Sequence, residues 1–241
     1  MNHRKASRIG EEGLLDFGDE LRKRHFTVDP GNWADTYIIG DVHGCYSELQ
    51  KLLRKIDPAR NTLLIFVGDL IRKGPDSSSV IDTVRENDNM VSVLGNNEAK
   101  VLRDDAEPGW LQDSDVDFIQ GMPVAVSWSD GLVVHGGIDP RLDPEEHTLK
   151  DLTEMRDMYG GGYDGTFWWE EYEGDREVFF GHTVLTKPIR DGNAVGLDTG
   201  CVYGGQLTAY HLDTSTFVTV EPEEKYLHRS ADSVVGEGNL E

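Results

Sequence analysis

The chain has 241 residues and a formal net charge of −22, from 45 acidic and 23 basic residues. One domain with a large core is expected at this length. A negative charge of this size opposes binding to nucleic acids and to anionic lipid, which excludes both as partners. The acidic residues are spread over the whole chain. We therefore interpret them as an adaptation of the surface to high salt, where counterions screen the self-repulsion.

The sequence carries few signals for export or membrane insertion. No apolar stretch approaches the roughly 18 residues of a membrane helix, and the basic N-terminus lacks the apolar region of a signal peptide. Cys45 and Cys201 are the two cysteines, too few for a disulfide framework or a thiolate zinc site. We expect a soluble, cytoplasmic protein.

Composition divides the chain into three parts. Residues 1–34 are polar and charged and are predicted to be an N-terminal extension. Residues 35–221 form the predicted domain, and 222–241 are predicted to be an acidic C-terminal tail. Both ends are expected to lie outside the core.

Short apolar runs alternate with helical patterns along the predicted domain. An apolar stripe at helical spacing over 49–56 predicts a helix capped by Ser47, and Pro75 is expected to open a second helix. The later part of the chain is richer in β signals, with a hairpin turn at 129–131. The predicted strands are 37–39, 63–67, 90–94, 132–134 and 177–180, followed by a strand pair at 207–210 and 217–220. The pattern predicts a mixed α/β sandwich.

The first five predicted strands are each followed by a glycine-flanked side chain that can bind metal. These side chains are Asp41, His43, Asp69, Asn96, His135 and His182. The spacing from His43 to Asp69 is 26 residues, and from Asp69 to Asn96 it is 27. Strand ends in open α/β sheets converge on one crevice. We therefore predict that all six side chains meet at one edge.

The donor types indicate which metals would bind. Oxygen and imidazole nitrogen without thiolate suit Mn²⁺, Fe or Zn²⁺ better than Mg²⁺ or Ca²⁺. Six ligands exceed what one catalytic ion needs, whereas two ions about 3.5–4 Å apart, bridged by Asp69, would use them all. Such sites serve phosphoryl transfer. The remaining histidines, His3, His25, His147, His211 and His228, are expected at the surface.

The order of these motifs resembles the calcineurin-like metallophosphoesterase superfamily over residues 36–212. Residues 68–77 and 197–209 are similar to the branch shared by serine/threonine phosphoprotein phosphatases and symmetrical diadenosine-tetraphosphatases. The resemblance implies a four-layer αββα sandwich of two mixed β-sheets flanked by helices. It also implies a dinuclear metal site at the sheet edge.

The resemblance also implies roles for individual residues. One ion would be held by Asp41, His43 and Asp69, and the second by Asp69, Asn96, His135 and His182. We expect both ions to be Mn²⁺. Lys73 stands where the family has a phosphate-binding Arg, and Arg156 matches a second one. A surface ion pair is an equal alternative for Arg156.

Two positions depart from the family pattern. Asn97 stands where the family has His, and Arg72 where it often has Asp. Asn97 can donate a hydrogen bond but no proton, so a general-acid contribution of about 10²–10⁴ in rate is not expected there. Arg72 is either a contact to the leaving phosphate or a surface residue. Trp168 and Trp169 are either core aromatics or a platform for adenine.

These departures favour substrates with good leaving groups. We expect a bis(5'-nucleosyl)-tetraphosphatase-like hydrolase acting on a nucleotide. A serine/threonine phosphoprotein phosphatase is the first alternative. A phosphodiesterase and a catalytically degenerate metal-binding protein are the others.

Overall fold

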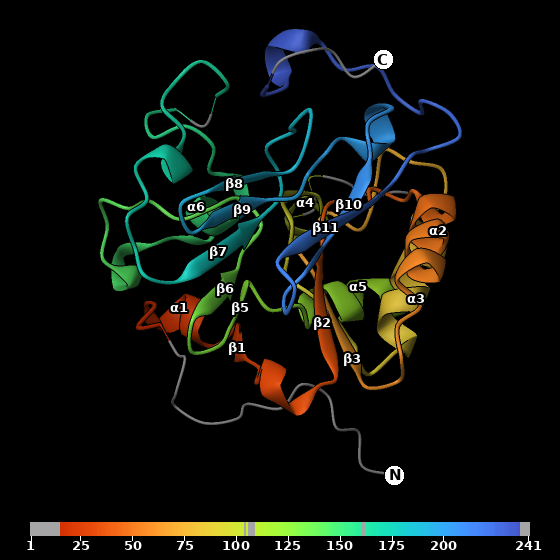
Figure 1. Ribbon diagram of the computed structural model, residues 1–241, viewed down its shortest axis with the longest axis horizontal. Coiled ribbons are helices and arrows are strands. Elements are labelled where there is room, and N and C mark those ends of the chain that lie inside the picture. Colours follow the sequence, from red (N-terminus) through yellow and green to blue (C-terminus); the bar gives the residue numbers. More distant parts are fainter. Residues whose placement is uncertain (1–14, 104, 106–108, 161, 237–241) are drawn as a thin grey trace.

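Two β-sheets packed against each other form the centre of the computed structural model, which describes residues 15–103, 105, 109–160 and 162–236 (Figure 1). One sheet has the order β11-β10-β2-β3-β4. Its strands are β2 (Asp35–Ile39), β3 (Thr62–Phe66), β4 (Met90–Ser92), β10 (Leu207–His211) and β11 (Thr216–Val220). The first three are parallel, and β10 pairs antiparallel with both β2 and β11. The predicted strand pair near the C-terminus is confirmed.

The second sheet is also mixed and has the order β1-β5-β6-β7-β9-β8. Its strands are β1 (His25–Thr27), β5 (Ala125–Ser127), β6 (Gly131–Val133), β7 (Glu177–Phe180), β8 (Ile189–Asp191) and β9 (Ala194–Gly196). Strands β6 and β7 are parallel, as are β7 and β9. The predicted hairpin turn joins β5 to β6, where the Trp128 N–H donates to the Gly131 carbonyl at 3.0 Å.

Short helices lie outside the sheets. They are α1 (Asp19–Arg22), α2 (Tyr46–Ile56), α3 (Ser77–Glu86), α4 (Asn96–Leu102), α5 (Asp113–Gln120) and α6 (Leu149–Glu154). The 3₁₀ turns are η1 (Pro30–Asn32), η2 (Pro144–Glu146), η3 (Trp168–Glu170), η4 (Cys201–Tyr203) and η5 (Ala231–Ser233). Both predicted helix starts shift slightly. Helix α2 begins one residue before Ser47, and the N-cap of α3 is Asp76, whose carboxylate accepts from the Ser79 N–H at 3.1 Å.

The alternation of strand side chains divides the core into layers. Ile38 and Ile65 belong to the apolar cluster between the sheets, together with Phe179 of the second sheet. Their neighbours Ile39 and Phe66 point to the other face and join the cluster that contains the helices. Because side chains alternate along a strand, these residues show that β2 and β3 are buried on both faces. This is the predicted αββα sandwich.

Part of the N-terminal segment lies in the core, which corrects the prediction for that end, whereas none of the described residues 222–236 is buried. Phe17 and Leu21 are buried, and β1 pairs in parallel with β5. Residues 222–236 lie across the top of the view in Figure 1, where the Val235 N–H donates to the Val184 carbonyl at 2.8 Å. A few apolar side chains in a polar segment suffice to dock it. Residues 1–14 and 237–241 lie outside the described residues.

Two histidines expected at the surface are buried. His25 Nε2 lies 2.7 Å from Ser127 Oγ, and His147 Nε2 accepts from the Asp139 N–H at 3.0 Å. His147 Nδ1 also lies 3.1 Å from the Asp143 carbonyl, so both of its ring nitrogens have partners, whereas His25 Nδ1 is buried without a hydrogen-bond partner among the described residues. His228 is exposed and His211 is half-buried, whereas His3 lies outside the described residues. Within the described chain, no helix has the length and apolarity to cross a membrane.

Candidate metal centre

The six metal-type side chains meet where the two sheets present the ends of their parallel strands. Asp41 and His43 follow β2, Asp69 follows β3, and Asn96 follows β4. His135 and His182 follow β6 and β7 of the other sheet. Oxygen or nitrogen atoms of Asp41, Asp69 and His135 all lie within 4.8 Å of one another, and all three side chains are buried. The predicted convergence of the strand ends is therefore present.

Asp69 lies between two groups of donors. On one side, His43 Nε2 is 3.5 Å from Asp69 Oδ2 and 3.8 Å from Asp41 Oδ2. On the other side, His135 Nε2 is 3.4 Å from Asp69 Oδ1 and 3.2 Å from Asn96 Oδ1. His182 completes this second group, with Nδ1 3.1 Å from Asn96 Oδ1. One carboxylate thus contacts both groups, which is the geometry that a shared ligand requires.

The histidine rings are oriented by the backbone. His135 Nδ1 lies 2.8 Å from the Val67 carbonyl, and His43 Nδ1 lies 3.3 Å from the Ile71 carbonyl. In His182 the other ring nitrogen contacts a carbonyl, because Nε2 lies 3.2 Å from the Glu154 carbonyl. A carbonyl takes the N–H of one ring nitrogen and leaves the other nitrogen as a lone-pair donor towards the centre. The donor set fits divalent metal ions on these grounds.

The backbone of the centre is locally strained. His43, Asp69 and His182 have φ values of 50°, 52° and 64°, in the left-handed region that non-glycine residues rarely adopt. Such outliers cluster at functional sites, where the surrounding structure holds them. Gly181 shows how tight the packing is, because a Cβ there would overlap the Asp41 carboxylate. The glycines beside the ligands therefore make room for the carboxylates.

The buried charges perturb one another. Burial, and next the neighbouring Asp198, raise the pKa of Asp41 well above its usual range. Burial also acts to raise the pKa of Asp69, but His135 outweighs it and holds that pKa low. For His135, burial acts to lower the pKa, yet Asp69 and Asp41 raise it to about 9. A bound cation would offset the mutual repulsion of the buried Asp41 and Asp69 carboxylates.

Two predicted phosphate-binding cations are at the rim of the centre. Lys73 Nζ lies 2.7 Å from His43 Nε2, and burial together with Lys73 lowers the pKa of His43 to about 3. The Arg156 guanidinium carbon is 5.1 Å from the centre of the Tyr163 ring. The Tyr163 hydroxyl accepts from the Val184 N–H at 3.2 Å, two residues after His182. Burial, and next His135 and Arg156, lower the pKa of His182.

Asn97 contacts the shared carboxylate directly. Its backbone N–H donates to Asp69 Oδ1 at 2.9 Å, and its side-chain amide donates to Asp69 Oδ2 at 2.6 Å. Arg72 has a φ of 69°, and its backbone N–H donates to Ser77 Oγ at 2.8 Å. Among the described residues, none accepts a hydrogen bond from the Arg72 guanidinium.

Glu98 is a positioning residue that the sequence interpretation missed. Its carboxylate accepts from the backbone N–H groups of Asp69, Gly95 and Ile71 at 3.0, 3.0 and 3.1 Å. Burial, and next Asp69, raise the pKa of Glu98 to about 7. The signal was present, because Glu98 is the third residue of α4 and reaches back to the N-cap Gly95, as in a capping box.

The tryptophans belong to the core. Trp168 and Trp169 are buried, and their rings pack on Phe180 at centroid distances of 4.9 Å each. Trp168 Nε1 donates to the Gly136 carbonyl at 3.2 Å. These contacts confirm the core alternative and leave neither ring available as a platform for adenine.

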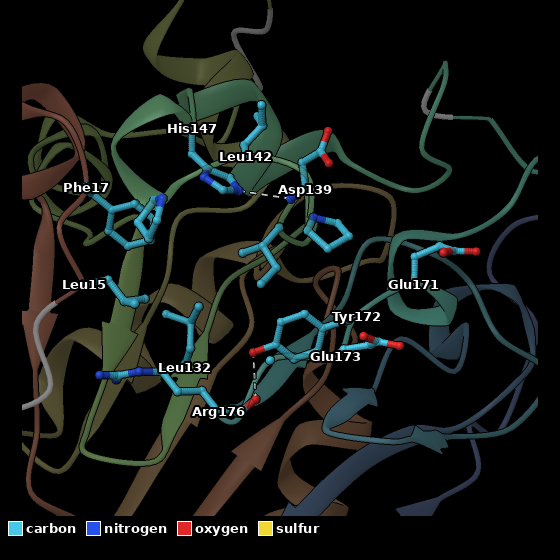
Figure 2. A pocket seen from close by; sticks show the side chains of 14 residues that line it. Leu15, Phe17, Leu132, Asp139, Leu142, His147, Glu171, Tyr172, Glu173 and Arg176 are labelled. Carbon is cyan, nitrogen blue, oxygen red and sulfur yellow. Dashed lines mark hydrogen bonds between the residues drawn. The ribbon is translucent and has the colours of Figure 1, made fainter.

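A separate cavity of about 410 Å³ lies beside the second sheet (Figure 2). Its wall includes Phe17, His147, Tyr172 and Arg176, and in Figure 2 the Tyr172 hydroxyl donates to the Arg176 carbonyl at 2.9 Å. None of the six metal-type side chains lines it. The cavity is therefore distinct from the centre in which the carboxylates and imidazoles converge.

An αββα sandwich with this donor set at its strand ends defines a metal-dependent phosphoesterase. The chain belongs to the calcineurin-like phosphoesterase family, whose pattern matches residues 35–201. The family implies divalent metal ions, and Asp41, Asp69 and His135 form a candidate group for binding them.

Known relatives divide between two activities. An asymmetrical bis(5'-nucleosyl)-tetraphosphatase of Anoxybacillus flavithermus is 28% identical, with 79% of this chain and 95% of the relative covered. Serine/threonine-protein phosphatase 1 of Salmonella typhimurium is 29% identical over 75% of this chain and 93% of its own. A crystal structure assigned as a diadenosine tetraphosphatase has 26% identity and a TM-score of 0.72, covering 82% of this chain and 97% of the other.

Proposed function

We propose that this protein hydrolyses a phosphoanhydride bond of a dinucleoside polyphosphate. The observation that carries the proposal is the position of Asn97. In this site an amide, donating to Asp69 at 2.6 Å, stands where the family has an imidazole that can give up a proton. A centre without that acid is suited to leaving groups that depart as stable anions. A nucleotide phosphate, with a second pKa near 6, is such a group.

The same centre would hold two divalent ions, for which Mn²⁺ is our choice. Asp41, His43 and Asp69 would hold one ion, and Asp69, Asn96, His135 and His182 the other. When bound, the ions supply Lewis-acid polarisation and lower the pKa of water at the centre. The protein's part is to fix these side chains, which the backbone carbonyls and Glu98 do before any substrate arrives.

The cations at the rim would stabilise the phosphoryl group as its charge develops. Lys73 lies beside His43, and Arg156 packs on Tyr163, whose hydroxyl accepts from the Val184 N–H two residues after His182. Fixed positive charge aimed at the reacting phosphate is a large term in phosphoryl transfer. Lysine keeps the charge of the family's arginine at this position but lacks its two-pronged fork. Arg72 would contact the leaving phosphate.

Product analysis with metal removal tests this proposal. The protein is stripped with a chelator, reloaded with Mn²⁺, and assayed on diadenosine tetraphosphate, with nucleotides separated by chromatography. We expect turnover only after reloading, with two ADP from symmetrical cleavage or ATP and AMP from asymmetrical cleavage. Full metal occupancy without turnover of any activated phosphoester would instead indicate a degenerate metal-binding protein.

A serine/threonine phosphoprotein phosphatase is the second candidate. The similarity to the Salmonella phosphatase favours it. A water molecule or another side chain would then have to protonate the serine oxygen, because Asn97 cannot. Rapid phosphate release from a phosphoserine peptide would place this candidate first.

We also propose that the protein works in the cytoplasm at high salt. Cys45 and Cys201 are buried and form no disulfide. Free thiols are consistent with a reducing compartment. The net charge of −22 favours a medium in which counterions screen repulsion. Urea unfolding in dilute buffer and in molar KCl tests the second point, and equal midpoints would contradict it.

A further inference from the structure

A cluster of cations and tyrosines adjoins the metal centre. Its members are Lys73, Arg156, Tyr163, Tyr203 and Arg229, and we call them the rim cluster. Arg229 comes from the C-terminal segment, whereas Tyr203 ends the turn η4 and the other three come from loops of the domain. The Arg229 guanidinium carbon lies 5.4 Å from the centre of the Tyr163 ring and 4.9 Å from that of Tyr203. The C-terminal segment therefore adds a third cation to the two predicted ones.

Hydrogen bonds hold Arg229 in one orientation. It donates to the Tyr163 hydroxyl at 2.7 Å, the Tyr203 hydroxyl at 3.1 Å and the Ser233 carbonyl at 2.7 Å. These bonds to described residues use three of the five N–H groups of a guanidinium. Two N–H groups are left that can bind an anion. Because the fork is already ordered, little conformational entropy would be lost when it does so.

The cluster is connected to the centre on both sides. On one side, Tyr203 contacts Lys73, whose Nζ is 5.4 Å from the ring centre and 2.7 Å from His43 Nε2. On the other side, the Tyr163 hydroxyl accepts from the Val184 N–H at 3.2 Å, two residues after His182. Arg229 is thus one ring away from the lysine that faces the centre. Three cations gathered on a chain of net charge −22 make this rim locally attractive to anions.

We propose that Arg229, held by Tyr163 and Tyr203, binds the phosphates of the substrate that lie beyond the one being hydrolysed. This inference rests on the proposed function, because it makes the chain length of the polyphosphate the property that the rim recognises. A single phosphoryl group at the centre is within reach of Lys73, whereas a chain of four phosphates extends to Arg229.

The test compares substrates of different length in Arg229→Gln. The value of kcat/KM for diadenosine tetraphosphate should fall about 10- to 100-fold through KM, as expected for loss of a hydrogen bond to a charged group. The loss for p-nitrophenyl phosphate, which has one phosphoryl group, should be at least about tenfold smaller. Arg229→Lys should give an intermediate loss, because it keeps the charge without the fork. Equal losses for both substrates would overturn the proposal.

Two controls separate binding from structure. Arg22→Gln removes the same charge from an exposed ion pair with Asp16 and should leave both substrates unaffected. Tyr203→Phe removes the hydroxyl that accepts from Arg229 and keeps the ring, so its loss should again fall on the longer substrate. If Arg229 merely tethered the C-terminal segment, the melting temperature and both activities would fall together.

A binding measurement keeps this inference separable from the proposed function. Calorimetry on the Mn²⁺-loaded protein, with Mn²⁺ in excess, compares inorganic tripolyphosphate with inorganic phosphate. We expect Arg229→Gln to weaken tripolyphosphate binding about tenfold or more relative to phosphate. That result would stand even if diadenosine tetraphosphate were not turned over. Wild-type protein that binds both anions equally, or a variant that binds them as the wild type does, would overturn the inference.

Discussion

The metal centre and the rim cluster lie side by side but arise from the chain in different ways. Every metal-type side chain of the centre follows a strand, and backbone carbonyls and Glu98 fix the geometry from within the domain. The rim cluster depends on Arg229, which enters from the C-terminal segment and touches the domain through two tyrosine hydroxyls. The comparison shows that chemistry and substrate selection can be located on separately encoded parts of one fold.

Asp69→Asn should have the largest effect, because Asp69 contacts both groups of donors in the centre. Neutralising it removes the shared ligand, and we expect turnover of every substrate to fall by more than about 10³-fold, beyond the loss of one electrostatic donor. Metal analysis by atomic emission should show fewer bound ions. Asp88→Asn, an exposed acid, is the matched control. Retained activity with full metal content would contradict the assignment.

A paired replacement sharpens the comparison by changing the chemistry of the centre alone. Asn97→His with Arg72→Asp restores both residue types found in the family at these positions. The new imidazole should protonate poor leaving groups, so the rate on a phosphoserine peptide should rise relative to that on diadenosine tetraphosphate by about 10-fold or more. The readout is the ratio of the two kcat/KM values. An unchanged ratio would mean that a missing acid does not set leaving-group preference.

Glu98→Gln tests the support beneath the centre. The carboxylate accepts from three backbone N–H groups, one of them on Oε1 and two on Oε2. A glutamine keeps one accepting oxygen but must turn its NH₂ group towards the N–H donors on the other side. We expect metal affinity to fall about 10- to 100-fold, as for other residues that orient ligands, with the fold retained. Titration of Mn²⁺ followed by activity gives the affinity. A loss confined to the longer substrate would assign Glu98 to the rim cluster instead.

His25 provides a reference outside both regions. Burial, together with Arg176 and Arg22, lowers its pKa to about 4 from a usual value near 6.5. A folded-state pKa below the unfolded one means that stability is present above pH 6.5 and is lost as the pH falls towards 4. The loss is about 3.5 kcal/mol for about 2.5 pKa units at about 1.4 kcal/mol each.

The variant for this prediction is His25→Gln, which keeps a polar group near Ser127 but does not titrate. Its free energy of unfolding should depend less on pH between 7 and 4 than that of the wild type, as measured by urea unfolding. The exposed His228→Gln is the control. If the free energy of unfolding changes equally with pH in the wild type and in His25→Gln, other groups dominate the loss of stability in acid.

The sandwich and the convergence of the six metal-type side chains could be predicted because their signals are local. Apolar runs that end at Gly40, Gly68 and Gly95 show where the strands stop, and parallel strands bring such ends to one edge. The burial of Phe17 and His25 could not be predicted, because it depends on a parallel pairing between β1 and β5, about 100 residues apart. Arg229 was missed for the same reason: in sequence it is one arginine within an acidic tail, and only tertiary packing brings it to Tyr203.

The most direct test of the account is a comparison of initial rates with Mn²⁺ in molar KCl on three substrates. These are diadenosine tetraphosphate, a phosphoserine peptide and bis-p-nitrophenyl phosphate. The account predicts that diadenosine tetraphosphate is cleaved fastest, because its leaving group needs no proton from position 97. A preference for the phosphoserine peptide would contradict it and would mean that another group supplies the proton.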